Sequence, residues 1–334
     1  MKALQITGYG EVKDNLQMME VDKPAPKAHQ VLIEIKAASI NPIDYKIVDG
    51  ALKQVMKLDF PAPIGFDVSG VVTQCGADVK DLKVGDEVFS RVPTEDPGTI
   101  AEYIAVDASV VRKRPENLDF KQAASLPLVG LTTMQVFQRA NVRKGDKVLI
   151  HAGSGGIGTF ARQYAKTLGA YVYTTASTKN VDWVKDLGAD RVIDYKKEDY
   201  KNIVEPLDMV YDTLGEQYTA EAFEVVKEGG HVVSIAGPLD DETANNLGLN
   251  AIIRFILKLM RLKVTMKAKK ANAHYSYLLM NPDGDQLGEI KRLAEAGKIK
   301  PVLDQVFPFE KSIEAMQYLK DGHSKGKVVI SMEG

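Results

Sequence analysis

The amino-acid sequence predicts an α/β protein in which a doubly wound parallel sheet is joined to a smaller β-rich domain. A chain of 334 residues is long for a single hydrophobic core, so two domains are expected. The first third of the chain contains short apolar runs separated by Gly and Pro. From Lys147 onward, similar runs alternate with helical patterns, as they do in a parallel sheet with helical crossovers.

The β-rich region covers residues 1 to about 122. Turn signals such as Val84-Gly85-Asp86 and Asp96-Pro97-Gly98 separate its apolar runs, which indicates a small barrel or sandwich. The runs that we expect to form strands are Gln30–Ala37, Val68–Gln74, Glu87–Val92 and Ile100–Val106.

The second region alternates strands and helices and predicts a parallel sheet with right-handed crossovers. The expected strands are residues 147–152, 171–176, 191–195, 208–213, 231–236 and 263–268. Helices are expected at 159–168 and 220–227, ending near Gly169 and Gly229, where C-cap glycines are favoured. The tail adds an amphipathic helix at 287–296 and a last strand at 327–332.

Composition narrows the class of protein. The chain is 45% hydrophobic and 26% charged with a net charge of −2, so neither nucleic acid nor an anionic membrane is expected as a partner. The single cysteine, Cys75, excludes an internal disulfide and a zinc site of four thiolates. Because the chain begins directly with a strand-like segment, Met1–Ile6, we expect no signal or transit peptide and a cytoplasmic location.

The longest apolar stretch, Leu249–Val264, contains four basic residues and is too short and too charged to span a bilayer. As a basic amphipathic helix it could lie on a membrane surface. We favour a helix packed on the sheet or lining a subunit contact.

The segment Lys147–Gly158 predicts a dinucleotide site. A strand-like run feeds the turn Gly153-Ser154-Gly155-Gly156-Ile157-Gly158, which opens into a helical pattern. Glycines let the backbone approach a pyrophosphate, and the helix N-terminus offers free N–H groups and the positive end of its dipole. A glycine pattern alone is weak evidence, but a strand before it and a helix after it strengthen the prediction.

The end of the second expected strand indicates which nicotinamide cofactor is bound. An NAD site usually has Asp or Glu about 20 residues after the glycine turn, where this chain reads Thr174-Thr175-Ala176-Ser177-Thr178-Lys179. Ser177 can donate a hydrogen bond to a 2′-phosphate and Lys179 can supply charge, so we predict NADPH. Tyr195 is placed to lie against the adenine, or it is an edge tyrosine without a ligand.

Several motifs resemble those of the medium-chain dehydrogenase/reductase superfamily, from one end of the chain to the other. They are Asn41-Pro42-Ile43-Asp44-Tyr45-Lys46, Gly65-Phe66-Asp67-Val68-Ser69-Gly70-Val71-Val72, Val84-Gly85-Asp86-Glu87-Val88, Gly130-Leu131-Thr132-Thr133, Ala152–Gly158 and Gly326-Lys327-Val328. The resemblance implies a GroES-like catalytic domain (1–122 and 270–334) and a Rossmann NADP(H)-binding domain (123–269). It also implies a homodimer joined through the last Rossmann strand, near Val264–Lys267.

The chain departs from the zinc-dependent members of that superfamily. Those members carry Gly-His-Glu where this sequence reads Gly65-Phe66-Asp67, and they have a cysteine ligand near residue 40 and a thiolate lobe that are absent here. One carboxylate does not make a zinc site, so no metal is expected. The chain is therefore similar to the zinc-independent quinone oxidoreductases and enone or alkenal reductases. Of these two groups, the lysine at position 46 favours the enone reductases.

The resemblance implies a set of catalytic residues. Asn41, Asp44, Lys46 and Thr132 would lie beside the nicotinamide, with Asp44 pairing with Lys46; the alternative for that pair is a surface ion pair of little energetic value. Lys325 and Lys327 would approach the cofactor, or belong to a solvated basic turn. The five histidines show no ligand spacing, and none is expected to be catalytic.

These residues imply hydride transfer from NADPH to an enone, an alkenal or a quinone. Reduction of such a conjugated substrate spreads negative charge over several atoms, so hydrogen-bond donors suffice where a zinc Lewis acid is absent. The alternative, from another class, is an NADPH-binding protein without turnover, acting in sensing or as a structural or RNA-associated module.

Overall fold

The computed structural model describes residues 1–54, 56–322 and 324–333, so His323 lies outside the described residues. The chain forms two compact units, one of Met1–Leu131 with Asn281–Gly334 and one of Thr132–Met280. The first division falls inside helix α4 (Pro127–Ala140), and the second follows the last strand of the second unit. We refer to the two as the β unit and the sheet unit.

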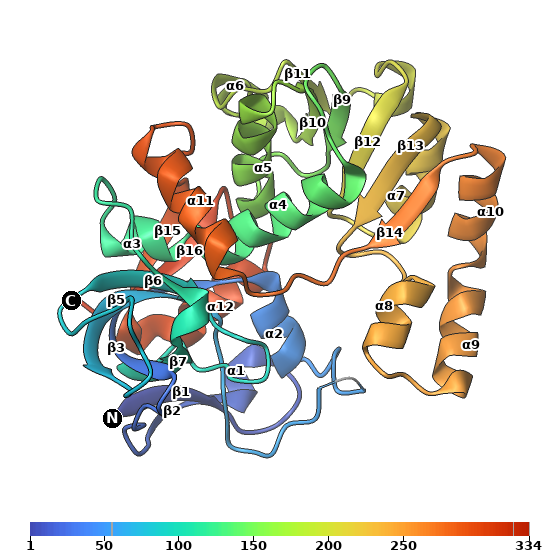
Figure 1. Ribbon diagram of the computed structural model, residues 1–334. Coiled ribbons are helices and arrows are strands. Elements are labelled where there is room, and N and C mark those ends of the chain that lie inside the picture. The colour runs from blue at the N-terminus through green and yellow to red at the C-terminus, as the bar shows by residue number, and fades with distance from the viewer. Residues whose placement is uncertain (55, 323, 334) are drawn as a thin grey trace. The chain divides into compact units, whose positions relative to one another are not determined.

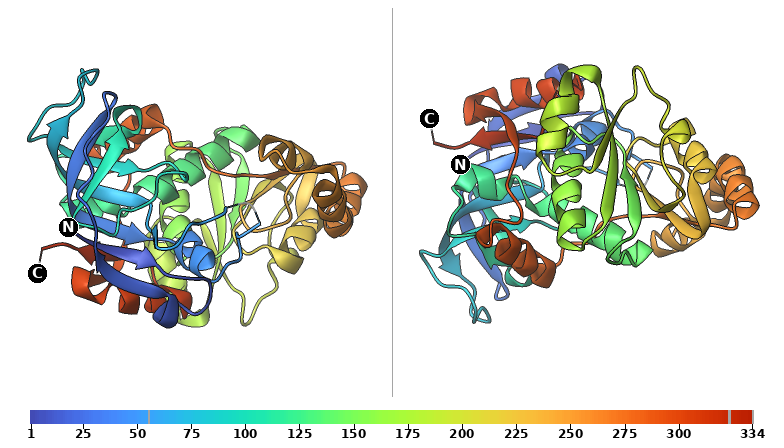
Figure 2. Two further views of the ribbon diagram at one scale, coloured as in Figure 1. Left: turned by 90° about the horizontal axis from the view of Figure 1, so that it is seen from below. Right: turned by 90° about the horizontal axis from the view of Figure 1, so that it is seen from above.

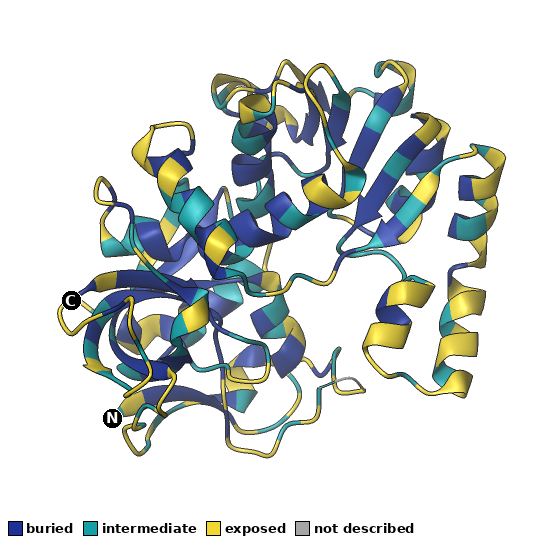
Figure 3. Cartoon of the chain, viewed as in Figure 1, coloured by how far each residue is buried: buried dark blue, intermediate teal, exposed yellow. Residues whose placement is uncertain are grey.

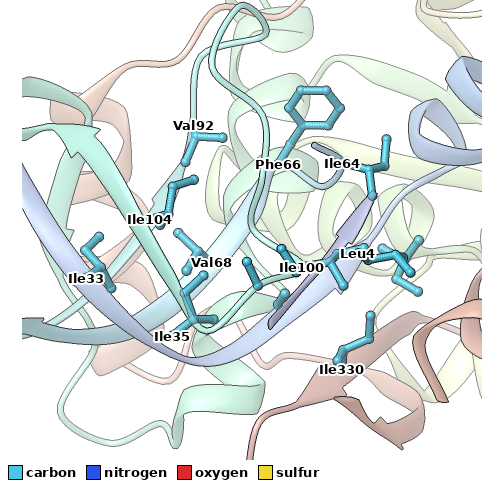
Figure 4. Close-up of a cluster of buried hydrophobic side chains, with 14 of the residues drawn as sticks. Leu4, Ile33, Ile35, Ile64, Phe66, Val68, Val92, Ile100, Ile104 and Ile330 are labelled. Atoms are coloured by element: carbon cyan, nitrogen blue, oxygen red, sulfur yellow. The ribbon is translucent and has the colours of Figure 1, made fainter. Parts of the chain in front are cut away.

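The β unit contains two sheets around one hydrophobic core. The larger sheet has the order β15 (Leu303–Pro308), β16 (Lys327–Ser331), β3 (Gln30–Ile40), β5 (Asp67–Cys75), β6 (Glu87–Arg91) and β8 (Val111–Lys113), with β7 (Tyr103–Asp107) also paired to β3. The smaller sheet has the order β2 (Leu16–Glu20), β1 (Lys2–Ile6) and β4 (Ala62–Pro63). Leu4 from the small sheet belongs to the same buried cluster as Ile33 and Val68 from the large one (Figure 4).

The C-terminal segment completes the β unit. Strand β16 pairs antiparallel with the second half of β3, from Ala37 to Ile40. All five residues of β16 are buried, so this strand is part of the core. The helices of this unit, besides the start of α4, are α1 (Val12–Asn15), α2 (Pro42–Val48), α3 (Phe120–Ala124), α11 (Gly284–Glu295) and α12 (Ser312–Lys320), with the 3₁₀ turns η1 (Ala108–Val110) and η5 (Phe309–Lys311).

The sheet unit is built on six parallel strands, as the sequence predicted. Their order is β11 (Arg191–Asp194), β10 (Tyr171–Ala176), β9 (Lys147–Ile150), β12 (Leu207–Asp212), β13 (Val226–Ser234) and β14 (His274–Tyr277). Every neighbouring pair is parallel. The strand order reverses between β9 and β12, where ligands bind in sheets of this kind.

Helices cover both faces of this sheet (Figures 1 and 2). Val148 and Ile150 of β9 pack on the face covered by α4, α5 (Gly156–Thr167) and α6 (Val181–Asp186). Leu149, pointing the other way, packs on the face covered by α7 (Glu216–Glu221) and α10 (Leu262–Lys270). The remaining helices are α8 (Asp241–Asn246), α9 (Ala251–Met260) and the 3₁₀ turns η2 (Thr178–Asn180), η3 (Tyr200–Asn202) and η4 (Ala222–Glu224).

Two expected elements are wrong. Residues 263–268 form part of helix α10, and the sixth strand is β14, so the segment Val264–Lys267 is not an edge strand through which a dimer could extend the sheet. The helix expected at 220–227 begins earlier, at Glu216, and is followed by a 3₁₀ turn and by strand β13 from Val226. Among the described residues, no helix has the length and apolar content needed to cross a membrane.

Candidate active site

The glycine turn follows the central strand β9 and leads directly into α5. Added Cβ atoms would lie 2.2 Å from Thr174 Oγ1 at Gly153 and 2.4 Å from the Ala152 carbonyl oxygen at Gly158, so neither position has room for a side chain. At Gly155 the nearest atom would be 3.5 Å away, an ordinary contact. The first and third glycines therefore close the turn, while the second leaves its outer side open for a phosphate group.

The strand ends beside the turn carry the other residues predicted to bind the cofactor. Ser177 follows β10 and is largely buried, with no side-chain cap on its 3₁₀ turn, whereas Lys179 in that turn is exposed. Tyr195 follows the neighbouring strand β11; its side chain is 58% exposed, and its N–H donates to the Ala176 carbonyl oxygen at 3.1 Å. These three residues therefore lie at adjoining strand ends, on the same edge of the sheet as the glycine turn.

A buried network at the ends of β9 and β12 was not recognised from the sequence. Asp212 accepts hydrogen bonds from Thr219 Oγ1 at 2.5 Å and Ser234 Oγ at 2.7 Å, and its other oxygen lies 3.4 Å from His151 Nδ1. These partners outweigh the effect of burial and hold the pKa of Asp212 well below its usual range. The network stabilises the loop after β12, at the point where the strand order reverses.

In the β unit, strand register gathers charged side chains into one buried cluster. Asp67 on β5 lies opposite Ser39 on β3 and opposite Arg91 on β6. Asp67 accepts hydrogen bonds from Ser39 Oγ, at 2.9 Å, and from the Leu128 N–H, at 2.9 Å. Arg91 is only 2% exposed, and its guanidinium lies 4.8 Å from the centre of the Phe66 ring. Sequence analysis missed Arg91, although a charge inside an apolar strand run was the available signal.

Lys327 and Asn41 complete this cluster. Lys327 is 5% exposed; its Nζ donates to Asn41 Oδ1 and lies 3.5 Å from Asp67 Oδ2. Asn41 Nδ2 donates to the same Asp67 oxygen at 2.9 Å. Burial lowers the pKa of Lys327 from its usual value. The Asn41 amide and the Lys327 ammonium are therefore part of a buried polar network inside the β unit.

Asp44 occupies the first turn of α2, and it differs from what the resemblance implied. Its Oδ2 accepts from the Asn41 N–H at 2.6 Å, as in a capping box, and its Oδ1 is buried without a hydrogen-bond partner. Burial, together with the nearby charge of Asp67, raises the pKa of Asp44 to about 7. Asp44 forms no ion pair with Lys46 in the part of the chain that the structure describes, and Lys46 is exposed.

The other predicted residues fall on both units. Thr132 is the first residue of the sheet unit and is 5% exposed within α4. Lys325 lies exposed just before β16.

The described residues do not bring potential metal ligands together. Across residues 1–54, 56–322 and 324–333, no group of three or more His, Cys, Asp or Glu side chains could hold a metal ion. At the position where zinc-dependent relatives have a ligand, Phe66 is fully buried in the apolar core. Both oxygens of the neighbouring Asp67 already accept hydrogen bonds. The residues present therefore do not fit a catalytic zinc ion.

Two features define the class of protein. One is a glycine turn at the switch point of a six-stranded parallel sheet, and the other is a separate β unit that the C-terminal strand completes. This combination is typical of two-domain dehydrogenases and reductases that bind a dinucleotide.

Comparison with known proteins identifies the family. Residues 27–116 match the alcohol dehydrogenase GroES-like domain, and residues 187–330 match a family described as zinc-binding dehydrogenase. The chain is 35% identical to a 2-methylene-furan-3-one reductase of Solanum lycopersicum, over 99% of this chain and 79% of the relative. It is equally identical, with the same coverage, to an NADPH-dependent alkenal/one oxidoreductase, chloroplastic, of Arabidopsis thaliana.

A solved structure agrees. The quinone oxidoreductase from Coxiella burnetii superimposes with a TM-score of 0.86 at 33% identity, covering 100% of this chain and 99% of that one. The chain belongs to the medium-chain dehydrogenase/reductase superfamily, in its quinone oxidoreductase and alkenal/one oxidoreductase branch. The GroES-like and Rossmann-like folds implied by the resemblance are confirmed.

Proposed function

We propose that this protein is a reductase that uses NADPH to reduce the activated carbon–carbon double bond of an enone or alkenal, or a quinone, without a zinc ion. The observation that carries the proposal concerns the residues that follow β10, at the edge of the parallel sheet beside the glycine turn. No carboxylate follows β10 there, and Ser177 and Lys179 stand in its place. A carboxylate at this point would repel the 2′-phosphate that distinguishes NADPH from NADH.

The chain's own residues fit such a cofactor. The backbone of Gly153–Gly158 and the N-terminus of α5 would hold the pyrophosphate, because helix N-termini bind anions through free N–H groups. Ser177 and Lys179 would hold the 2′-phosphate, and the exposed ring of Tyr195 would pack on the adenine. When bound, the nicotinamide supplies a hydride to an electron-poor carbon.

The substrate class follows from the chemistry that remains without a metal ion. Reducing an isolated ketone concentrates charge on one oxygen, for which zinc is the usual Lewis acid. Adding hydride to a conjugated carbonyl or a quinone spreads that charge, so hydroxyl and amide donors stabilise it sufficiently. Relatives named as a furanone reductase and an alkenal/one oxidoreductase support this substrate class.

The catalytic roles remain proposals from the family resemblance. Thr132 would contact the nicotinamide through its hydroxyl, and the exposed Lys46 would hold a ribose hydroxyl. Lys325 would approach the cofactor from the returning tail. Asn41, Asp44 and Lys327 would act from the buried cluster by fixing the start of α2, on which Lys46 is carried. A cytoplasmic homodimer remains part of the proposal.

A kinetic comparison tests this function. Protein treated with a strong chelator should oxidise NADPH when given a small enone, an alkenal or a quinone, and should prefer NADPH to NADH. Oxidation of saturated alcohols that is abolished by the chelator would contradict the proposal.

Binding measurements distinguish the alternative function. If the protein binds NADPH tightly but turns over none of a broad panel of enones, alkenals and quinones, the non-catalytic binding protein is the better description. The same titration with NADH serves as the internal control for the 2′-phosphate.

A further inference from the structure

Helix α9 and the start of α10 present an apolar face that nothing in the sheet unit covers. We define the α9–α10 face as the apolar side chains on these helices that are more than half exposed. They are Ile252, Phe255, Ile256, Leu259, Met260, Leu262 and Met266, with exposures of 51% to 74%. Figure 3 shows both helices as largely exposed, and none of the residues of α9 is buried. A patch of this size is unusual on a soluble monomer and marks an interaction surface.

The orientation of α9 places its apolar side outward. At 3.6 residues per turn, its five exposed apolar positions cover about 140° of the helix circumference. Ile253 and Leu257 lie on another side and are partly buried. The helix is nevertheless well terminated, because Asn250 Oδ1 accepts the Ile253 N–H at 3.0 Å. The sequence favoured a helix packed on the sheet or lining a subunit contact, and the structure leaves most of its apolar side exposed.

Helix α10 anchors this surface to the sheet. Val264 and Ala268 are buried against the core of the sheet unit. The buried Arg261 joins the two helices to the body of the unit: it donates to the Leu239 carbonyl oxygen at 2.6 Å and pairs with Asp241 at 2.7 Å. The exposed face is therefore held on a fixed support.

The same segment carries a concentrated positive charge. Between Thr243 and Pro282 the sequence has seven Lys and Arg residues and no Asp or Glu, although the whole chain has a net charge of −2. Arg261 pairs with Asp241 and Lys267 with Glu224. Within the described part of the chain, the other five form no ion pair. They are Arg254, Lys258, Lys263, Lys269 and Lys270.

We propose that the α9–α10 face binds the surface of an anionic lipid bilayer. A helix with an apolar face and flanking Lys and Arg lies in the plane of such a surface, with its apolar side chains at the boundary of headgroups and acyl chains. The unpaired lysines of α10, Lys263, Lys269 and Lys270, lie within about 100° of Leu262 around the helix and would contact lipid phosphates. This proposal does not depend on the reductase activity, and it replaces the expectation that no membrane is a partner.

A second copy of the chain fits this face less well. Most homodimers are two-fold symmetric, so the same patch would meet itself across the interface. The excess of unpaired basic residues on each copy would then face that of the other copy, and Asp241, whose charge lies near Arg254 and Lys258, would only partly compensate it. Anionic lipid satisfies both the apolar and the charged side chains.

Vesicle co-sedimentation tests the proposal with the full-length protein. It should sediment with vesicles containing phosphatidylglycerol and much less with phosphatidylcholine alone, and high salt should weaken binding. The variant F255D/L259D should bind at least about ten-fold more weakly. Its control, Val84→Asp, changes a side chain that is 62% exposed in the β unit and should bind normally.

Charge reversal tests the electrostatic part separately. The variant K269E/K270E should lose roughly five-fold in binding for each reversed charge, whereas Lys80→Glu, an exposed lysine of the β unit, should change binding little. Circular dichroism should show that each variant is folded, so that a loss of binding is not a loss of structure. Absence of sedimentation with anionic vesicles would overturn the proposal, as would equal binding by F255D/L259D.

A fluorescence measurement gives an answer that does not depend on destabilising variants. The chain has one tryptophan, so W183F/F255W carries its only indole on the proposed face. Its emission should shift to shorter wavelength with anionic vesicles and be quenched by lipids that carry a spin label in the acyl chain. An unchanged spectrum, or a concentration-dependent shift without lipid that coincides with dimer formation in sedimentation velocity, would instead reject the membrane proposal.

Discussion

The glycine turn of the sheet unit and the buried cluster of the β unit are assembled in different ways. The turn is one continuous segment from His151 to Gly158, and its shape follows from which of its residues lack a side chain. The cluster joins Ser39, Asp67, Arg91 and Lys327, which are brought together only by strand register. A local motif can be recognised from its consecutive residues. A cluster assembled by strand register cannot, because its members are far apart in the sequence.

Among the substitutions, the largest expected loss of stability comes from disrupting the buried cluster. Lys327→Met removes the ammonium next to Asp67 and leaves a buried carboxylate with less compensation, which should lower the free energy of unfolding by about 3 kcal/mol. Urea denaturation measures the loss. Lys325→Met, two residues earlier and exposed, is the control and should change little. The double variant K327M/D67N should recover part of the stability, and strictly additive losses would contradict direct coupling.

The glycine turn should be sensitive at one glycine and tolerant at another. In Gly158→Ala the new methyl would lie 2.4 Å from the Ala152 carbonyl oxygen, so the free energy of unfolding should fall by roughly 2 kcal/mol. In Gly155→Ala the nearest atom is 3.5 Å away, so stability should change by less than about 0.5 kcal/mol while NADPH binding weakens. Thermal denaturation and a fluorescence titration separate the two effects. Equal destabilisation by both variants would show that the turn is not shaped as described.

Asp44 should make the stability of the protein depend on pH. Burial raises the pKa of Asp44 from 3.8 to about 7, so the folded protein keeps a proton that the unfolded chain releases. The free energy of unfolding should therefore fall as pH rises between these values, by about 1.4 kcal/mol per pH unit at the steepest, and stay low above pH 7. Asp44→Asn, which keeps a neutral acceptor for the Asn41 N–H, should remove this contribution. If the free energy of unfolding depends on pH in the same way in the unchanged protein and in Asp44→Asn, Asp44 does not have this role.

The smallest expected effect is a change in the KM for NADPH, which tests whether NADPH is the cofactor. Lys179→Ala should raise the KM for NADPH about ten-fold and leave the KM for NADH unchanged, because a charge-assisted hydrogen bond to the 2′-phosphate is lost. Lys185→Ala, an exposed lysine one helix further along, is the matched control. Equal changes for NADPH and NADH would indicate that Lys179 does not contact the phosphate.

Most of the fold could be predicted because it depends on patterns within short segments. Five of the six expected parallel strands lie where the sequence placed them, each a short apolar run between turn residues. The failure at 263–268 is instructive. Val264, Met266 and Ala268 alternate as in a strand, but Val264 and Ala268 are buried and Met266 is 58% exposed, which is a helical spacing of four. A segment of six residues is too short to distinguish the two-residue period of a strand from the 3.6-residue period of a helix.

The candidate site was only partly predictable. Gly153, Ser177 and Lys179 could be placed at one edge of the sheet because each follows a strand that could be recognised, and the ends of parallel strands meet at one edge. The pairing of Asp44 with Lys46 was not found in the structure, because a buried carboxyl at the start of a helix satisfies the nearest backbone N–H first. The partners of Asp212 and Arg91 were not predicted, since nothing in a strand's own sequence shows which side chains face it across the sheet.

By itself, the order of residues determined the parallel sheet, the shape of the glycine turn and the absence of an acid after β10, because each depends on side chains close together in the chain. Only the tertiary structure decided that Lys327 is buried beside Asp67 and that the apolar side of α9 faces outward. Burial and pairing depend on which segments distant in sequence come into contact, and the free energy of those contacts does not appear in any one segment.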